Sequence, residues 1–254
     1  MASTTGCSLT RMAMATTITA TSMTTTTLTE AALARLLAWT SPAYPVGAFS
    51  YSHALEMAVE DGAVTKREHL VAYAEAALLH GAGAVDGGLL ALTWRAARAR
   101  DDAALDALAE LGSAFRGTAE LGLEARQPGG AFAQVTLAAW PDAGFAALAA
   151  RHPRSLTHAV AFGAAAGFAD LPLRAACFAW LAAFAANIVS AGVRLIPLGQ
   201  TDGQIATAAL LPILDAATEA ALAIEHPDDL GASALAIDLL SMRHETQYTR
   251  LFRS

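Results

Sequence analysis

Apolar residues recur at helical spacing through nearly the whole chain, and this periodicity limits the fold more than any other feature. From about residue 29 to residue 249, apolar side chains return every third or fourth position, and each run ends at Gly, Pro or a short polar cap. No run has the alternation of a half-buried strand. The abundance of Ala agrees with this pattern, because Ala has the highest helix propensity. The sequence therefore predicts an all-α, single-domain helical bundle of about ten helices with short loops.

Capping residues and prolines predict where the helices begin and end. Thr29 starts the first helix, which must stop at Ser41-Pro42 because proline disfavours α geometry in the residue before it. Ser50 or Ser52 can cap the next helix, which runs to about residue 60. The other helices are expected after a capping box of Thr65 and Glu68, and then at residues 85–100, 102–127, 131–139, 142–151, 155–169, 173–195, 205–224 and 230–249.

The first 28 residues differ from the rest of the chain. They are rich in Thr, carry one charge at Arg11 and lack periodic apolar positions, so we expect residues 1–28 to be a disordered extension. Thr, Ser and Gly interrupt every apolar run here, which argues against a secretory signal. Translation from Met23 is an alternative. The expected division is an extension (1–28), an all-α domain (29–240) and a C-terminal tail (241–254).

Charge and cysteine content restrict the class of partner and the compartment. The chain has 16 basic and 23 acidic residues, a net charge of −7, without the clusters of Lys and Arg that bind phosphate backbones. We therefore expect no nucleic-acid partner. Cys7 and Cys177 are the only cysteines, too few for a disulfide framework, so a reducing, cytoplasmic location is the simplest expectation.

One segment has the length and apolar character of a membrane span. Residues 175–193 carry no charge and are long enough to cross a bilayer. Against insertion, the segment is rich in Ala and contains Asn187, Ser190 and Gly192. We favour a buried core helix and expect no membrane partner. In the preceding helix, Gly163 and Gly167 are four residues apart, and we interpret them as a close contact between helices of the bundle.

Motifs for chemistry are weak. The loop with Gly199 and Gly203 lacks the Lys and Ser/Thr of a phosphate-binding loop. The seven histidines and two cysteines show none of the short spacings typical of metal ligands, and no Gly-x-Ser-x-Gly motif is present. We therefore assign no catalytic, cofactor-binding or metal-binding residue and expect a non-enzyme.

The last fourteen residues reverse the charge of the body. They contain three Arg and one Glu together with aromatic and aliphatic side chains, a mixture typical of protein interfaces. If this tail is helical, Arg243, Gln247 and Arg250 share one face, and Tyr248, Leu251 and Phe252 form an apolar patch on another. A tail docked on its own core is an equally consistent interpretation.

Three separated blocks of sequence resemble the UreF family of urease accessory proteins. The first reads S-P-x-x-P-V-G-A-F-S-Y-S over residues 41–52 and continues with Leu55-Glu56. The second reads V-x-x-I-P-L-G-Q-T-D-G-Q over 193–204, and the third R-H-E-T-Q-Y-x-R-L-F-R-S over 243–254. Residues 118–127 are similar to the central helix of the family. Pro128-Gly129-Gly130 departs from that pattern.

This resemblance implies an all-α, dimeric urease accessory protein that is not itself an enzyme. Such a protein joins UreD, called UreH in some species, and the GTPase UreG, and the complex delivers nickel to apo-urease. Its implied role is that of a nickel-insertion chaperone, which scaffolds the nickel-binding complex and modulates GTP hydrolysis by UreG. In this role one arginine of the chain would act in trans on the GTP bound to UreG and stabilise charge on the transferring phosphoryl group. The chain itself would hold no stable cofactor, although the complex depends on nickel and GTP.

The resemblance also assigns residues. The third block is expected to dock the UreD partner, with Arg243, His244, Glu245, Gln247, Tyr248, Arg250, Leu251, Phe252 and Arg253 as partner-binding residues. Two loops are expected to face partners, through Pro45, Gly47, Phe49, Ser50 and Glu56 in the first and Pro197, Gly199, Gln200, Thr201, Gly203 and Gln204 in the second. Purely internal turns are the alternative for both loops, whose glycines are expected to need a positive φ or a close approach. The competing function is a stand-alone helical module for a hydrophobic ligand or a membrane surface.

Overall fold

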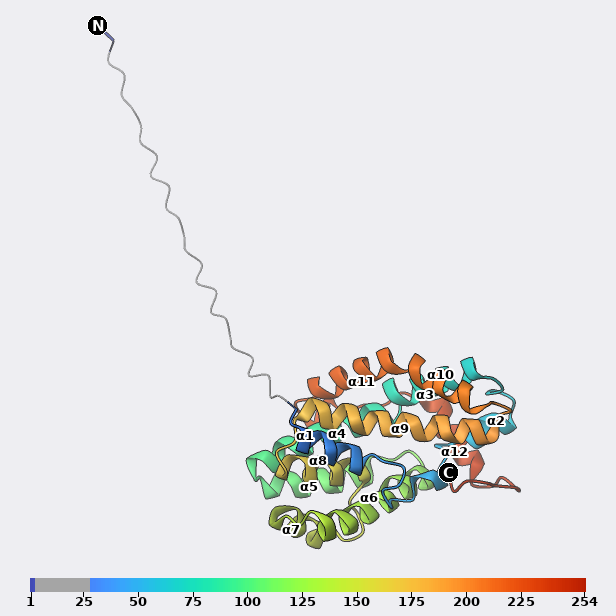
Figure 1. The fold of residues 1–254 in the computed structure, drawn as a ribbon, viewed down its shortest axis with the longest axis horizontal. Coiled ribbons are helices and arrows are strands. Elements are labelled where there is room, and N and C mark those ends of the chain that lie inside the picture. Colours follow the sequence, from blue (N-terminus) through green and yellow to red (C-terminus); the bar gives the residue numbers. More distant parts are fainter. Residues whose placement is uncertain (3–27) are drawn as a thin grey trace.

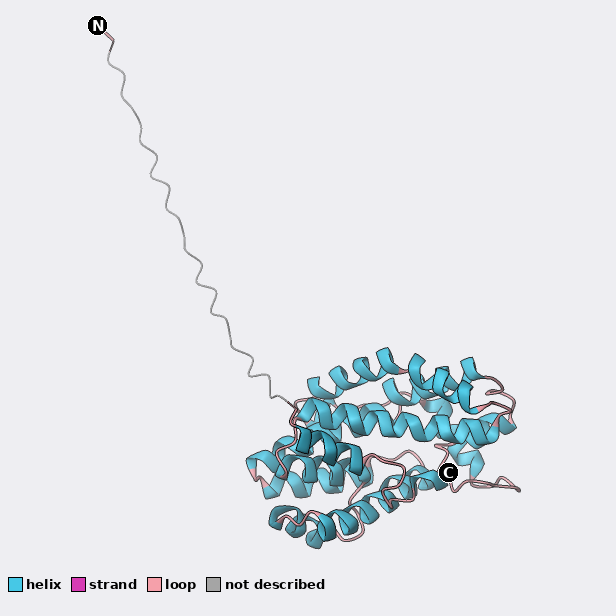
Figure 2. Cartoon of the chain, viewed as in Figure 1, coloured by secondary structure: helices cyan, strands magenta, loops and turns pink. Residues whose placement is uncertain are grey.

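Helices make up the regular structure of the described chain (Figure 2), which confirms the all-α expectation. The computed structural model describes residues 1–2 and 28–254, so most of the expected extension at residues 1–28 lies outside the described residues. The α-helices are α1 (Glu30–Trp39), α2 (Leu55–Glu60), α3 (Arg67–Leu79), α4 (Ala82–Ala99), α5 (Asp102–Ala114), α6 (Ala119–Ala139), α7 (Ala143–Arg151), α8 (His158–Phe168), α9 (Leu173–Leu195), α10 (Gln200–Ala209), α11 (Leu211–Ala223) and α12 (Leu235–His244). Two short 3-10 turns are η1 (Ala48–Ser50) and η2 (Pro227–Asp229).

The long helix α9 runs along the length of the molecule, with helices on either side of it (Figure 1). In that view α3, α10 and α11 lie above α9, and α5, α6, α7 and α8 lie below it. Helices α2 and α12 pack on each other at the right-hand end, where the C-terminus also lies. The arrangement therefore brings the first and last sequence blocks of the chain to one end of the bundle.

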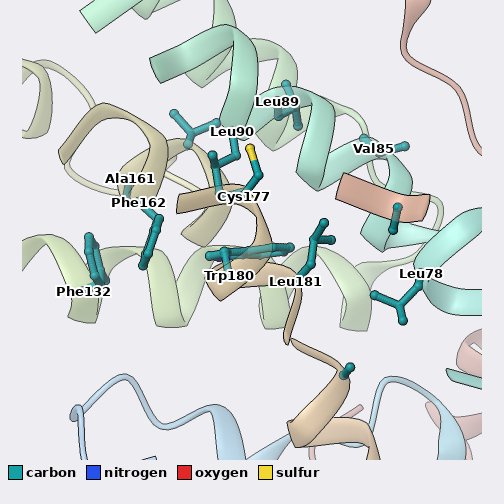
Figure 3. Packing of buried hydrophobic residues seen from close by; sticks show 14 of the residues in the cluster. Leu78, Val85, Leu89, Leu90, Phe132, Ala161, Phe162, Cys177, Trp180 and Leu181 are labelled. Carbon is teal, nitrogen blue, oxygen red and sulfur yellow. The ribbon is translucent and has the colours of Figure 1, made fainter. Parts of the chain in front are cut away.

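Close approach of α4 and α8 forms the centre of the core. A Cβ atom at Gly163 would lie 2.6 Å from the carbonyl oxygen of Leu90, and one at Gly167 would lie 2.6 Å from that of Trp94. Only glycine permits this distance, so the predicted contact between helices at these two positions is confirmed. Large side chains fill the space around the contact, as Figure 3 shows for residues of α4, α6, α8 and α9: Leu89, Leu90, Phe132, Phe162, Cys177, Trp180 and Leu181.

The helix boundary expected at residues 128–130 lies earlier in the chain, between α5 and α6. The predicted helix 102–127 is wrong, because α5 ends at Ala114 and Thr118 caps a new helix, accepting the Leu121 N–H at 3.2 Å. The predicted stop at residues 128–130 is also wrong, because α6 continues through Pro128. Pro128 is buried, and a Cβ atom at Gly129 would lie 2.2 Å from the Leu156 carbonyl oxygen. Pro128 cannot donate the helical hydrogen bond at its position. Close packing against the segment before α8 holds α6 together there.

Three further helix predictions need correction. The predicted helix 205–224 is two helices, α10 and α11, bent by 45° where Pro212 opens the second. The capping box at Thr65 is not formed, since Lys66 precedes α3 without a side-chain cap. The last helix is shorter than predicted, because α12 begins at Leu235 and ends at His244. In contrast, the predicted caps Thr29 and Asp142 both accept a backbone N–H as expected, from Ala32 and Phe145.

Three stretches of the described chain have the length and apolar character of a membrane span. Helix α9 and the stretch Arg67–Ala99, which covers α3 and α4, are long and apolar enough to cross a bilayer, and the bent pair α10–α11 would be a third candidate. Half of the apolar window of α9 is buried inside the bundle, where it packs against α4, α8 and α11. The interpretation of α9 as a core helix agrees with this packing, and the absence of a membrane partner stays a prediction.

Candidate partner-docking site at the C-terminal tail

Glu56 connects the start of the chain to its end. A turn with two left-handed residues, His53 (φ 56°) and Ala54 (φ 61°), precedes α2, and the hydroxyl of Tyr73 donates to the His53 carbonyl oxygen at 2.7 Å. The N-cap of α2 is Ala54, so neither predicted serine is the cap residue, but Ser52 Oγ does accept the Glu56 N–H in the first turn at 3.2 Å. Left-handed backbone costs about 1–2 kcal/mol for a residue with a Cβ, so these contacts hold a strained turn. As a result the Glu56 carboxylate points inward, with only 7% of the residue exposed.

The Glu56 carboxylate holds the backbone of the tail. Its two oxygens accept the N–H groups of Leu251 at 2.7 Å and Phe252 at 2.9 Å. The same carboxylate lies 3.2 Å from Nε2 of His244, which is fully buried. Hydrogen bonds to an ionised acceptor are about twice as strong as neutral ones, and burial excludes competing water. The geometry therefore fixes the path of the tail across α2.

Glu120, in the first turn of α6, forms the other wall of this cluster. One oxygen lies 2.7 Å from His244 Nδ1, and the other accepts a hydrogen bond from Arg250 at 2.8 Å. Thr118 and Ser241 hydroxyls also meet at 2.7 Å, which joins α6 to α12. The imidazole thus lies between two carboxylates, and Arg250 supplies a positive charge beside them.

The last two residues pair with the first sequence block. The Arg253 N–H donates to the Ser50 carbonyl oxygen at 2.9 Å, and the Ser52 N–H donates to the Ser254 carbonyl oxygen at 3.1 Å. The Ser254 hydroxyl donates to Glu124 at 2.6 Å. Ser254 is completely buried, so the tail ends inside the fold and not in solvent.

Arg194 joins all three sequence blocks. It lies in the second block at the end of α9, donates to the Phe49 carbonyl oxygen of the first block at 3.0 Å, and places its guanidinium carbon 4.4 Å from the centre of the Phe252 ring. This is a cation–π contact, typically worth about 0.5–1 kcal/mol when exposed. Phe252 is 4% exposed beneath it. The three blocks that carry the family resemblance are therefore contiguous at this residue.

The expected helical face of the tail is wrong. The helix ends at His244, and Phe252 points inward, away from the exposed Tyr248 and Leu251. Most tail residues make contacts within the chain, as the alternative of a self-docked tail implies: Arg243 with Asp61, His244 with Glu56 and Glu120, Arg250 with Glu120, and Arg253 with Ser50 and Gln127. The hydrogen bond from Arg243 lowers the pKa of Asp61 below its ordinary value.

Of the nine predicted tail residues, His244 and Phe252 are buried, and the others lie at the surface. Tyr248 is fully exposed and Leu251 is 65% exposed. Glu245 is also exposed, and Gln247 is half-buried with a side-chain oxygen that lacks a partner. Of the nine predicted tail residues, Tyr248 and Leu251 are thus the apolar ones that a partner can reach.

The two predicted loops lie in different places. The loop with Pro45 and Phe49 adjoins the tail, and Phe49 is 68% exposed. The second loop is joined to α3 instead, since Asp202 pairs with Arg67 at 2.8 Å, and no hydrogen bond or ion pair among the described residues links it to the tail. Pro197, Gly199, Gln200, Thr201 and Gln204 are exposed there.

The glycine predictions for these loops are partly confirmed. Gly47 has φ +73°, and a Cβ at Gly203 would lie 2.9 Å from Val193, so both positions need glycine. Gly199 has an ordinary φ of −82° and open space around it, so the prediction for that residue is wrong.

The cysteine of the described residues, Cys177, lies near the start of α9 and is not part of this cluster. Burial raises the pKa of the Cys177 thiol to about 12, which leaves it protonated and unreactive inside α9. No group of three or more His, Cys, Asp or Glu side chains within residues 1–2 and 28–254 is arranged to hold a metal ion. What the cluster does is fix the path of the tail across α2 and α6.

Comparison with known proteins identifies the family. The sequence profile of UreF matches residues 64–211, more than half of the chain. A protein from Granulibacter bethesdensis named urease accessory protein UreF is 60% identical over 227 residues, which cover 89% of this chain and 95% of that relative. The chain belongs to the UreF family.

Other relatives carry the same name at lower identity. Urease accessory protein UreF of Rhodopseudomonas palustris is 47% identical over 228 residues, 88% of this chain and 92% of that protein. Its counterpart in Methylorubrum populi is 46% identical over 220 residues, 87% and 98% of the two chains. The resemblance seen in the three sequence blocks is thus confirmed along most of the chain.

Sequence reasoning missed several residues of the site in this UreF-family protein. Glu120 and Glu124 are four residues apart on α6 and share one helix face, a spacing visible in the sequence. Arg194 and Asp61 carry no local signal, because their partners are distant in the chain. An outward stripe on α12 was also missed, with Leu235, Leu239 and Met242 at least half exposed.

Proposed function

We propose that this UreF-family protein is a non-enzymatic subunit of the urease maturation complex. It would bind the UreD (UreH) accessory protein and the GTPase UreG in the cytoplasm, as a homodimer, and so help to deliver nickel to apo-urease. The complex would transfer nickel and hydrolyse GTP, and the chain would act in it as chaperone and scaffold.

The observation that supports a docking role is the way in which the tail is held. Glu56 and Glu120 fix the backbone and the charged side chains, while Tyr248 and Leu251 stay in solvent. Large apolar side chains on a rigid backbone lose little conformational entropy when they enter a partner's pocket, and such residues dominate binding energy at protein interfaces. Arg243, Arg250 and Arg253 of the same tail are also exposed, with Arg243 paired to Asp61 and Arg250 paired to Glu120.

Deleting the tail is a poor test, because His244, Phe252 and Ser254 belong to the core of the cluster. The sharper test replaces the exposed anchors in the full chain, as Tyr248→Ala with Leu251→Ser. We expect this double variant to retain its thermal melting point and to lose UreD and UreG in a pull-down. The control is Leu37→Ser, which alters a 62% exposed leucine on α1. Unchanged capture of both partners by the double variant would overturn the docking role.

The proposed effect on GTP hydrolysis has a separate test. A regulatory partner that stabilises charge on the transferring phosphoryl group raises the GTPase rate, by up to about 10⁵-fold in known cases. Single-turnover hydrolysis by UreG is measured with UreD alone and with UreD plus the full chain. An unchanged rate would remove this part of the proposal and leave the docking role intact.

A further inference from the structure

His244 lies in a buried cluster of charged groups that joins α12 to α2, α6 and the tail. Its side chain has no exposed surface, and the side chains of Glu56 and Glu120 are only 8% and 11% exposed. Nδ1 of the ring lies 2.7 Å from Glu120, and Nε2 lies 3.2 Å from Glu56. A titratable ring is therefore enclosed at the place where the backbone of the tail is held.

The hydrogen-bond partners of the ring indicate its protonation state. Carboxylate oxygens accept hydrogen bonds and do not donate them, so the hydrogens between His244 and its two neighbours come from the ring. A neutral imidazole has one N–H group and one lone pair, and can satisfy only one of the two carboxylates. An imidazolium ion donates from both nitrogens. Both distances are those of hydrogen bonds, so the geometry fits the charged ring.

The charges of the cluster balance only when the ring is charged. Glu56 and Glu120 carry two negative charges, and Arg250 supplies one positive charge through its hydrogen bond to Glu120 at 2.8 Å. Ionic groups nearby face other partners: Arg243 faces Asp61, Glu124 faces His53, and Arg253 faces Gln127. A neutral His244 would leave one negative charge uncompensated in a buried site, which is unfavourable.

Loss of a ring proton would act on the tail through Glu56. The shorter contact is the one from Nδ1 to Glu120, so Nδ1 keeps its hydrogen in a neutral ring, and the lone pair of Nε2 then faces an oxygen of Glu56. That same oxygen accepts the Phe252 N–H at 2.9 Å, and the other oxygen accepts the Leu251 N–H at 2.7 Å. Repulsion between the lone pair and the carboxylate would displace the group that holds both amides.

We infer that His244 is an imidazolium ion that clamps Glu56 and Glu120 together, and that the tail is released when rising pH removes one of the two ring protons. The clamped tail binds one more proton than the released tail, so its order is complete at lower pH and is lost as pH rises. His158 acts in a different range, because its pKa of about 4 concerns acid pH. As a control of partner docking, the clamp rests on the proposed function, since Tyr248 and Leu251 stand on this backbone.

The test follows the full-length ¹⁵N-labelled protein by NMR from about pH 6 to about pH 9, a range in which the charge of histidine responds to its surroundings. Shifts of the ring nitrogens show whether His244 carries one proton or two. Exchange of the Leu251 and Phe252 amides, relative to an unstructured chain at the same pH, measures the order of the tail. We expect two ring protons at the lower end, and protection of both amides at least about tenfold lower once one proton is lost.

The amide of Phe162, inside α8, is the internal control and should keep its protection across the range. A single ring proton on His244 at the lower end would overturn the inference, because a neutral ring beside a protonated carboxyl group is then the correct description. Two ring protons throughout, or tail protection that does not follow the loss of one, would also overturn it.

Two variants assign the effect to His244. His244→Gln cannot become charged, so protection of the tail amides should be low and should not change over the range. His53→Asn removes the neighbouring histidine that faces Glu124, and Asn tolerates the left-handed backbone there. We expect this control to keep the pH dependence of the unmodified protein. If His244→Gln does not fold, the ring shifts of the unmodified protein and the exchange in His53→Asn decide, and loss of the pH dependence in His53→Asn overturns the inference.

Failure of the clamp and failure of the docking role give different results, because amide exchange is measured without a partner. Unchanged capture of UreD by the variant with Tyr248→Ala and Leu251→Ser would remove the docking role and leave the clamp intact. Constant protection of the tail amides, together with loss of capture by that variant, would remove the clamp and leave the docking role intact.

Discussion

The backbone N–H of Phe252 donates to the carboxylate of Glu56 at 2.9 Å, across 196 positions of sequence. Leu251 donates to the other oxygen of the same carboxylate. One acidic side chain near the start of the described fold thus holds the backbone on which the exposed Leu251 side chain stands. This relationship ties the first family motif to the last.

Glu56→Gln should loosen the tail. The amide keeps one acceptor oxygen but turns an NH₂ group toward backbone donors, so at least one buried N–H loses its partner at a cost of about 1–3 kcal/mol. We expect faster hydrogen exchange at the Leu251 and Phe252 amides. Glu60→Gln, on the exposed side of the same helix, is the matched control. Equal protection in the two variants would show that Glu56 does not hold the tail.

Gly163→Ala should destabilise the bundle. The new Cβ atom would lie 2.6 Å from the Leu90 carbonyl oxygen, and relieving that overlap must push α8 away from α4. Overpacking of this kind costs about 1–3 kcal/mol in the free energy of unfolding. Gly130→Ala is the control, because it is also helical but has open space, and it should stabilise α6 by about 0.5–1 kcal/mol. Similar melting temperatures for both variants would contradict the close contact.

His158 should make stability depend on pH below neutrality. Its pKa is about 4 in the folded protein, against about 6.5 when unfolded. Between these values the unfolded chain binds more protons, so stability falls as pH falls from 6.5 to 4. The share due to His158 is on the order of 3 kcal/mol over this window. Urea denaturation at pH 7 and pH 4.5 should therefore show a smaller loss for His158→Phe than for the unmodified protein, and an identical loss would refute the assignment.

Cys177 should be inert in the folded protein. Burial raises the pKa of its thiol to about 12, and its side chain is fully enclosed in α9. In a Cys7→Ser variant, which leaves Cys177 as the remaining cysteine, we expect no reaction with a thiol reagent at pH 8 and one equivalent after unfolding in guanidinium. Rapid reaction under native conditions would mean that α9 opens far more readily than its packing indicates.

Sequence patterns predicted helix starts and helix contacts correctly where residues close together in the sequence determine them. Thr29 and Asp142 cap their helices as expected, and the pair Gly163 and Gly167 forms the predicted contact. Pro128 misled the prediction, because a proline usually ends a helix and tertiary packing here carries the helix through it. Pro212 was overlooked inside a periodic stretch, where it separates α10 from α11.

The site was predicted in composition but not in geometry. The tail's mixture of Arg and aromatic residues indicated an interface, yet a helical face was assumed beyond His244. Most of its charges are instead neutralised by distant residues, such as Glu120 for Arg250 and Asp61 for Arg243. Contacts that span more than a hundred positions leave no periodic trace in one sequence, so only the folded chain distinguishes buried Phe252 from exposed Leu251.

The affinity of the full chain for UreD, measured by calorimetry for Glu56→Gln against Glu60→Gln, tests the link between tail geometry and docking most directly. If Glu56 orders the tail before its partner binds, the Glu56→Gln variant must order the tail during binding. A cost of about 1–2 kcal/mol in binding free energy corresponds to a roughly 5- to 30-fold weaker Kd. Glu60→Gln should bind as the unmodified protein does. Equal Kd values for the two variants, with tail exchange accelerated in Glu56→Gln alone, would show that the ordered tail has no part in binding UreD.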